Sequence, residues 1–328
     1  MRRGALGIAV LLGACAGSVK PKATAPPDPA NIPRLFSAES PWNQPIPEGA
    51  ALDPDSPALV QTLVMGAGDP GIWINLPEWS VPRFFADANT PRYDVEVSRV
   101  RGEGFEEGSM IPVPDEAAPD PESDSHMLVV DLIGHREYDF FKAAPTGTGW
   151  SCAVCASIAI DGTGVRPPED SANPWTLAHG ARACGFPLGA GLITPEEIAA
   201  GEIPHALEMS VRFVRANEYV SPASTGHAET NEVLPDRGLR CGTRVRLDPT
   251  LDVTTLGLNS AGTVIARALQ KYGAFIGDYA GGVVLVADNA PQAVEKWRGV
   301  LSSADVAKLP LGHFFVLAPP GPVHKKKL

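Results

Sequence analysis

The sequence lacks the short motifs that identify several common classes of enzyme. It contains no GxSxG, no HExxH and no Walker-type phosphate loop, so Ser–His–Asp hydrolysis and nucleotide use are poorly supported. An excess of basic residues is also missing, because 38 Asp and Glu outnumber 27 Lys and Arg and give a formal net charge of −11. A chain of this charge has no electrostatic reason to bind nucleic acid or an anionic surface.

A long hydrophobic run is missing at the N-terminus. The apolar stretch of residues 5–12 follows Arg2 and Arg3, and it is too short to span a bilayer but typical of a signal peptide. It leads into Leu-Gly-Ala-Cys, which ends at Cys15 and resembles the lipobox of bacterial lipoproteins. By that resemblance Cys15 is lipidated; an ordinary signal peptide, cut after Ala14 or Ala16, is the alternative.

These features predict an exported protein of the bacterial cell envelope, held at the outer membrane or surface by a lipid anchor. We assign residues 1–15 to the signal peptide and the Pro- and Ala-rich residues 16–35 to an extended, semi-rigid linker. Residues 36–318 are expected to form a single β-rich domain, and residues 319–328 a flexible basic tail. The oligomeric state is not readable.

Cysteines are few, and four remain after Cys15: Cys152, Cys155, Cys184 and Cys241. An even number in an exported protein indicates two disulfides, while a CxxC pair with two further cysteines also fits a zinc site. We favour disulfides. Residues 149–160 read as one strand, in which Cys152 and Cys155 would point to opposite faces, so each is expected to pair with a distant cysteine.

Glycine and proline are abundant, with 33 of each, and they interrupt the chain about every ten residues. This spacing is typical of many short strands joined by turns. The candidate strands are residues 71–76, 81–87, 94–100, 126–132, 136–143, 155–160, 206–214, 243–247, 274–279 and 282–288. The acidic segment 115–124 is expected to be a solvated loop.

Only four helices are predicted, over residues 55–68, 194–201, 260–273 and 292–301. In the second, Thr194 can cap the start, Pro195 suits the first helical position and Gly201 can end it. In the third, Ser260 is expected to cap the start and Gly273 to close the end. The fold class is therefore mainly β, and we expect a two-sheet, jelly-roll-like β-sandwich with a few peripheral helices.

One predicted hairpin carries an unusual density of ionisable groups. Residues 123–141 read SDSHMLVVDLIGHREYDFF, with two runs of strand formers on either side of a glycine-containing turn. The ionisable residues are His126, Asp131, Arg136, Glu137 and Asp139. A histidine beside a carboxylate can exchange a proton near neutral pH, whereas the alternative is a solvated sheet face with a His–Asp hydrogen bond.

The register of this hairpin decides which side chains meet. A four-residue loop, residues 132–135, places His126, Glu137 and Asp139 along one face, within reach of a shared ligand. A five-residue loop, residues 131–135, moves His126 next to two aromatic residues instead. The hydrophobic pattern leaves both registers open.

Other candidates are scattered along the chain. His205 begins a strand and is either a core residue or a residue at a cleft. Arg182, in a glycine-rich turn, can clamp a carboxylate or sulfate or pair with a nearby acid. Asp278 lies near a predicted sheet end, and Trp150 can stack on a sugar ring. No short ligand spacing indicates a metal site, and we expect no cofactor.

Several motifs together resemble a broad group of exported bacterial proteins, most of which have no assigned activity. The motifs are SDSHMLVVDLIGHREYDFF, ARACGFPLGAGLI, EEIAAGEIPHALEMSV with YVSPA, and ARALQKYGAFIGDY, and they span about residues 36–317. The resemblance implies roles for His126, His205, Tyr272 and Asp278. Ser221 stands where relatives tend to have tryptophan, which weakens an aromatic sugar platform at that position.

That group is similar in character to β-sandwich proteins that act on or bind polysaccharides. The first hypothesis is therefore a polysaccharide lyase or glycoside hydrolase, with His126, Glu137 or Asp139, His205 and Tyr272 in catalysis. Trp150, Arg182 and Asp278 would bind the substrate, with an acidic sugar at Arg182. The second hypothesis is a non-catalytic surface lipoprotein that binds a glycan or a partner protein. Convergence of both histidines and a carboxylate in one cleft favours the enzyme.

Overall fold

The computed structural model describes residues 32, 34–98, 105, 109–166, 180–227 and 237–325. Three predicted segments lie outside the described residues in whole or in part: the signal peptide with Cys15, most of the linker, and residues 326–328 of the basic tail. Within them the chain forms eighteen strands, β1 to β18, and four α-helices, α1 to α4. The prediction of a mainly β fold with few helices is confirmed.

The largest sheet has six strands in the order β1-β16-β11-β15-β14-β17. Their bounds are Ile72–Asn75 (β1), Val283–Val286 (β16), Leu207–Val211 (β11), Ala274–Tyr279 (β15), Arg244–Leu247 (β14) and Phe314–Val316 (β17). Two pairs, β1 with β16 and β11 with β15, are parallel, and the other three pairs are antiparallel. This mixed sheet needs long crossover connections, which the intervening helices and loops supply.

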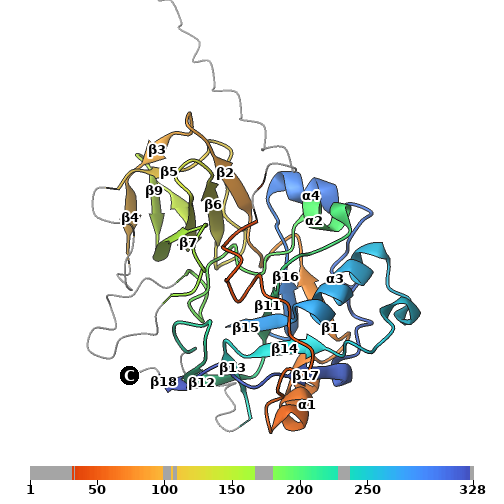
Figure 1. Ribbon diagram of the computed structural model, residues 1–328. Helices are drawn as coiled ribbons and strands as arrows, with labels where there is room; N and C mark the ends of the chain where they lie inside the picture. Colours follow the sequence, from red (N-terminus) through yellow and green to blue (C-terminus); the bar gives the residue numbers. More distant parts are fainter. Residues whose placement is uncertain are drawn as a thin grey trace, which may run out of the picture.

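A second sheet has four strands in the order β10-β7-β6-β2. Their bounds are Val154–Ala159 (β10), Arg136–Phe141 (β7), Met127–Asp131 (β6) and Arg83–Ala86 (β2). Figure 1 shows this sheet in a separate part of the molecule from the six-stranded sheet. Three small sheets complete the described part: β13-β12-β18 (Leu239–Cys241, Val214–Tyr219, His324–Lys325), β3-β5 (Arg92–Tyr93, Ile111–Pro112) and β4-β9-β8 (Val95–Val97, Trp150–Cys152, Ala144–Pro145). With five sheets described, a two-sheet sandwich is not confirmed.

All ten predicted strand segments contain strands and all four predicted helices form. The helices are Ser56–Ala67 (α1), Pro195–Ala200 (α2), Ser260–Lys271 (α3) and Pro291–Trp297 (α4). Helix α2 begins with a capping box, in which the Thr194 side chain and Glu197 bond each other's backbone N–H, and Gly201 ends it at φ 79°. The predicted cap of α3 is wrong: Asn259 caps it by accepting from the Gly262 N–H, and Ser260 is the first helical residue.

The hairpin adopts the four-residue loop. Asp131 pairs with Arg136 and Leu128 with Asp139. The Asp131 side chain accepts hydrogen bonds from the N–H groups of Ile133 (3.0 Å) and Gly134 (2.8 Å). This Asx-type turn stabilises the loop and thereby selects the register that aligns Glu137 and Asp139.

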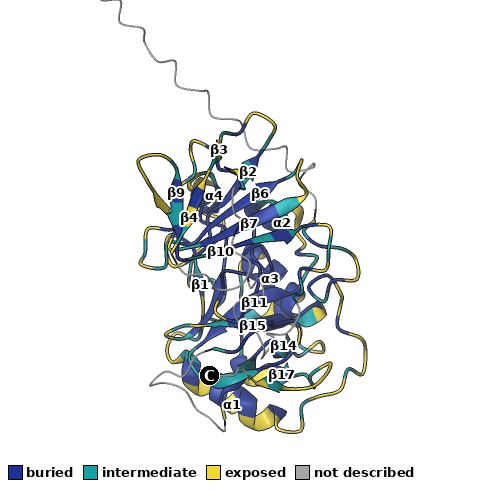
Figure 2. Ribbon diagram, turned by 90° about the vertical axis from the view of Figure 1, so that its left-hand side faces the viewer, coloured by how far each residue is buried: buried dark blue, intermediate teal, exposed yellow. Residues whose placement is uncertain are grey.

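Three apolar clusters hold the chain together, and most residues of their strands are buried (Figure 2). The largest surrounds the six-stranded sheet and its helices. A second lies within the four-stranded sheet and its small neighbours. The third joins them, because Leu128 and Val130 of β6 pack with Leu188, Leu192 and Val286 of the other part. The segment around residues 180–193 is therefore held between the two larger sheets.

The cysteine pairing differs from the prediction. A disulfide joins Cys184 to Cys241 across 57 positions, so neither of these cysteines is left to pair with Cys152 or Cys155, whose own side chains lie next to each other. Cys152 ends β9 and Cys155 lies in β10, which belong to different sheets. Because the chain turns at Ala153 between them, the two cysteines are not on opposite faces of one strand.

Candidate functional site

A cavity of about 650 Å³ lies between the six-stranded sheet and the residues that lead into β6. Three partly exposed aromatic side chains line it: Trp73 (38% exposed), Trp79 (47%) and Tyr279 (36%). Its polar lining includes Asp69, Asn75, Ser80, Asp124, His126, Arg182, Ser210 and Asp278. We call this cavity the aromatic pocket.

One row of residues across the six-stranded sheet forms the floor of the aromatic pocket. Trp73 pairs with Val284, Val284 with Ser210, and Ser210 with Asp278. These residues belong to the adjacent strands β1, β16, β11 and β15, and all four line the cavity. Neighbouring strands lie about 4.8 Å apart, so the row is roughly 14 Å long. We call it the strand row.

A β-bulge brings Asp278 onto this floor. Met209 pairs with Ile276 but Ser210 pairs with Asp278, so Gly277 is the extra residue on β15. Without the bulge, Asp278 would be one position further along and its side chain would point to the other face of the sheet. A Cβ on Gly277 would lie 2.6 Å from Oε1 of Glu208, so glycine also makes room for that carboxyl group.

The carboxyl groups of the hairpin are buried beneath the turn that carries Arg182. Oδ2 of Asp139 accepts from the N–H of Ala181 (3.3 Å) and of Leu188 (3.0 Å), and Oε1 of Glu137 accepts from the N–H of Gly189 (3.5 Å). Burial raises the pKa of Asp139 to about 6. Burial, with the charge of Asp139 beside it, also raises the pKa of Glu137 well above its usual value. Glu137 and Asp139 are not among the described residues that line the aromatic pocket. Through these hydrogen bonds they hold the turn that carries Arg182, which does line the pocket.

Arg182 pairs with a buried acid that the sequence analysis missed. Its Nη1 lies 3.8 Å from Oε2 of Glu208, and the two side chains are 3% and 0% exposed. Burial raises the pKa of Glu208 to about 7, and burial likewise raises the pKa of Asp278. The Ala183 N–H donates to Oδ2 of Asp278 (3.4 Å). Glu208 and Asp278 therefore face Arg182 from two neighbouring strands.

His126 lines the same pocket but is a poor base. It is 9% exposed, and burial together with the positive charge of Arg182 lowers its pKa to about 3. The imidazole is therefore neutral at physiological pH and can hydrogen bond to a ligand. A group with so low a pKa is a weak proton acceptor near neutrality.

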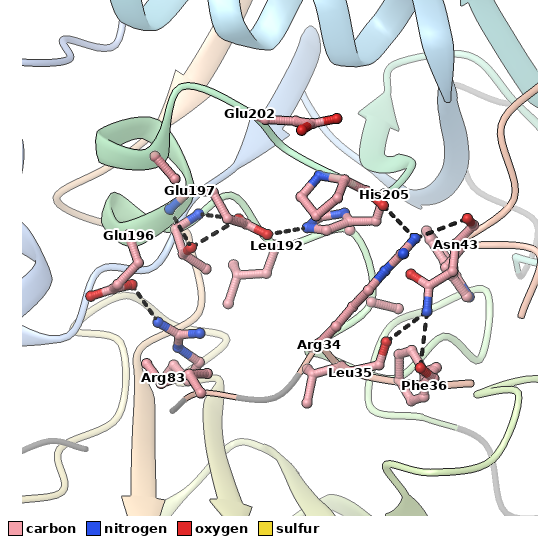
Figure 3. A pocket seen from close by; sticks show the side chains of 18 residues that line it. Arg34, Leu35, Phe36, Asn43, Arg83, Leu192, Glu196, Glu197, Glu202 and His205 are labelled. Carbon is pink, nitrogen blue, oxygen red and sulfur yellow. Dashed lines mark hydrogen bonds and ion pairs between the residues drawn. The ribbon is translucent and has the colours of Figure 1, made fainter. Parts of the chain in front are cut away.

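His205 lies elsewhere, in a cavity of about 370 Å³ shown in Figure 3. Its Nε2 is 2.8 Å from Oε1 of Glu197, and its Nδ1 is 2.9 Å from the Ala206 carbonyl. Although burial opposes the charged form, the Glu197 carboxylate raises the pKa of His205. Arg83 bonds Glu196 at 2.8 Å on the opposite side of this cavity. Four of the labelled charged groups thus form two ion pairs, Arg83 with Glu196 and His205 with Glu197, which indicates a structural network.

Two further predicted residues are buried in apolar surroundings. Tyr272 belongs to the largest apolar cluster and is 6% exposed, and Trp150 belongs to the second and is 9% exposed. Neither contributes to the described lining of the aromatic pocket. Of the predicted site residues, the structure thus brings together His126, Arg182 and Asp278, with Glu137 and Asp139 behind them.

The main residues that sequence reasoning missed are Trp73, Trp79, Glu208 and Ser210. The alternation of Ile72, Trp73 and Ile74 was a usable signal, because it places the tryptophan on the outward face of a strand. The position of Trp79 depends on a contact between segments far apart in the sequence, because its backbone N–H donates to Oδ1 of Asp120 (3.2 Å). Asp120 is 2% exposed, so the acidic segment is not a fully solvated loop.

Comparison with known proteins adds no relative. No family model, curated protein or solved structure matches the chain. Among the described residues there is no group of three or more His, Cys, Asp or Glu side chains that could hold a metal ion. The helices of the described part are also too short or too polar to cross a membrane.

Proposed function

We propose that this protein is an exported, lipid-anchored protein of the bacterial envelope that binds a glycan in the aromatic pocket. The export and anchoring rest on the leader sequence and on Cys15 in its lipobox-like context. The binding rests on the structure of the pocket. A non-enzymatic role is favoured because His126 and His205 line different cavities.

One observation carries the proposal: three partly exposed aromatic side chains, Trp73, Trp79 and Tyr279, line one cavity that also holds buried polar groups. Exposed aromatic side chains that gather in one place mark binding sites for ligands or partners. Sugar rings suit such a site, because their C–H faces pack on aromatic rings and their hydroxyls need hydrogen-bond partners.

Glycan binding is tested by screening the mature domain against an array of soluble and immobilised polysaccharides. Trp73→Ala is expected to weaken binding at least about fivefold, because stacking of a nucleic-acid base on an aromatic ring contributes about 1–3 kcal/mol and we expect a similar contribution for a sugar ring. Ile133→Ala is the matched control, since Ile133 is 60% exposed in the hairpin loop and outside the pocket lining. Absence of binding to every glycan, together with capture of a protein through the same pocket, would favour the partner-protein alternative.

A second candidate function is a polysaccharide lyase or glycoside hydrolase at the same pocket. It is favoured by Asp278, a pocket carboxyl group whose pKa is raised by burial and which faces Arg182. Turnover of any bound polysaccharide that is lost in Asp278→Asn would support it. If His126→Ala leaves such turnover unchanged, His126 has no catalytic role.

Anchoring is tested separately from binding. Full-length protein expressed in a bacterial host should incorporate labelled palmitate and partition with membranes, and Cys15→Ser should abolish both. Secretion of unlabelled wild-type protein would show that the leader is an ordinary signal peptide.

A further inference from the structure

Trp79 has a backbone conformation that is unfavourable for a residue of its size. Its φ is 58°, in the left-handed region, where a bulky L-residue is strained and glycine is not. Phe36 also has a left-handed backbone (φ 68°), but it is 6% exposed and packs in the largest apolar cluster. Trp79 is 47% exposed and belongs to none of the three described clusters. Packing therefore explains the strained conformation at Phe36 but not at Trp79.

Hydrogen bonds hold Trp79 in this conformation from both sides. Oδ1 of Asp120 accepts from the backbone N–H of Trp79 (3.2 Å). Oδ2 of Asp120 accepts from the N–H of Ser80 (3.1 Å) and from Nδ2 of Asn289 (2.6 Å). The Trp79 carbonyl accepts from Nδ2 of Asn75 (2.7 Å). Because Asp120 is 2% exposed, the carboxylate that receives these bonds is shielded from water.

Asp120 also joins two segments that line the aromatic pocket. Its side chain holds Trp79 and Ser80, and its backbone N–H donates to the His126 carbonyl (2.8 Å). Trp79, Ser80 and His126 all line the cavity. The backbone from which the Trp79 ring enters the pocket is thus fixed before a ligand arrives. Such preorganisation lowers the entropy lost on binding.

Strained backbone that the surrounding structure maintains is typical of binding sites. The half-exposed ring of Trp79 lines the cavity, so a ligand can reach it, and its flat apolar faces suit a sugar ring. We infer that Trp79 is a preformed platform on which one sugar ring of the glycan stacks, with Asp120 and Asn75 as the positioning residues that set it. This inference rests on the proposed glycan-binding function and assigns the residue that determines affinity within it.

Binding is measured by isothermal titration of the mature protein with trisaccharides of the array polysaccharides, among them cellotriose, mannotriose, xylotriose and chitotriose. Trp79→Ala and Trp79→Gly should each weaken the tightest wild-type interaction at least about fivefold, on the scale of one base stacked on an aromatic ring. His135→Gly is the matched control and should retain wild-type affinity. His135 also has a left-handed backbone (φ 50°) but is exposed in the hairpin loop, outside the described pocket lining.

Thermal unfolding without a ligand tests the strain separately. Trp79→Gly and Trp79→Ala both lack the indole ring, and they differ in whether the residue tolerates a left-handed backbone. The glycine variant should therefore unfold at a midpoint about 1–3 °C above that of the alanine variant. Equal midpoints, or a lower midpoint for glycine, would overturn the argument that strain holds the platform.

Asp120→Asn tests the positioning role, because asparagine has one oxygen for the donors that share the carboxylate. It should weaken binding about threefold or more in wild type but less than about twofold further in Trp79→Ala, since it acts through Trp79. Equal losses in both backgrounds would overturn that role. Asn75→Ala, which removes the bond to the Trp79 carbonyl, gives the same comparison if Asp120→Asn is unstable.

The binding result separates this inference from the proposed function. Wild-type affinity in Trp79→Ala would overturn the inference and leave glycan binding intact. If the wild-type protein binds none of the trisaccharides and no polysaccharide on the array, the proposed function fails together with the inference.

Discussion

Replacing Asp139 by alanine is expected to destabilise the protein strongly, because this carboxylate satisfies the turn beneath Arg182. Its Oδ2 accepts from two backbone N–H groups, those of Ala181 and Leu188, at 3.3 and 3.0 Å. Each buried N–H left without an acceptor costs about 1–3 kcal/mol, so Asp139→Ala should lower the free energy of unfolding by roughly 2–6 kcal/mol. Asp139→Asn keeps one oxygen for both donors and should cost about 1 kcal/mol.

The assay is urea unfolding at pH 7, followed by tryptophan fluorescence and fitted to a two-state transition. Asp161→Ala is the control, because Asp161 is an exposed acid just after the neighbouring strand β10, and its effect should stay within about 0.5 kcal/mol. Equal destabilisation by Asp139→Ala and Asp139→Asn would refute the role of the two hydrogen bonds. A cost below about 1 kcal/mol for alanine would refute it as well.

Three further predictions follow from the same region. The contribution of Glu137 and Asp139 to the free energy of unfolding should fall as pH rises from about 4 through 6, because the folded state retains protons on these two groups that the unfolded chain releases near its usual pKa values. Denaturant titrations of wild type and Glu137→Gln should therefore differ in pH dependence, with stability falling less with rising pH in the variant, and identical pH dependence of the two would contradict this. Gly277→Ala should lower the free energy of unfolding by about 1–3 kcal/mol and abolish glycan binding, because the added Cβ would lie 2.6 Å from Oε1 of Glu208. Gly281→Ala is the control: its Cβ would meet no atom within 4 Å, so thermal unfolding should be unchanged. Serine at both Cys184 and Cys241 should cost about 4 kcal/mol, as expected for a 57-residue separation, and an unchanged denaturation midpoint would argue against a stabilising disulfide.

Local patterns predicted the elements well, because each strand and helix is determined mainly by neighbouring residues. The segment from Thr194 to Gly201 carries its cap, its first-turn proline and its terminating glycine within eight positions, and α2 has these features. The hairpin register was left open from hydrophobicity alone. The Asp131 carboxylate, which bonds the Ile133 and Gly134 N–H groups, was the missing local signal for the four-residue loop.

The pocket could not be predicted in the same way, because it depends on contacts between distant segments. The strand row joins Trp73, Ser210 and Asp278 only after four strands, β1, β16, β11 and β15, pair side by side. The Gly277 bulge then reverses the side on which Asp278 points, which simple alternation along the strand does not reveal. The pairing of Cys184 with Cys241 likewise follows from tertiary structure.

The catalytic cluster expected from the sequence is divided by the fold. The resemblance of the motifs to those of other exported proteins is what groups the two histidines. In the structure, His205 bonds Glu197 of the α2 capping box, and His126 enters the aromatic pocket as a neutral side chain. His126 precedes β6 of the four-stranded sheet and His205 precedes β11 of the six-stranded sheet, and residue patterns within each strand do not specify how these sheets are placed.

The central claim, that the aromatic pocket is a glycan-binding site, is tested most directly by measuring the affinity of wild-type protein and Trp73→Ala for the glycan that binds best on the array. The account predicts at least about a fivefold loss of affinity in Trp73→Ala with an unchanged thermal unfolding midpoint, while Ile133→Ala retains wild-type affinity. Equal affinity in wild type and Trp73→Ala would contradict the account and place the binding site elsewhere.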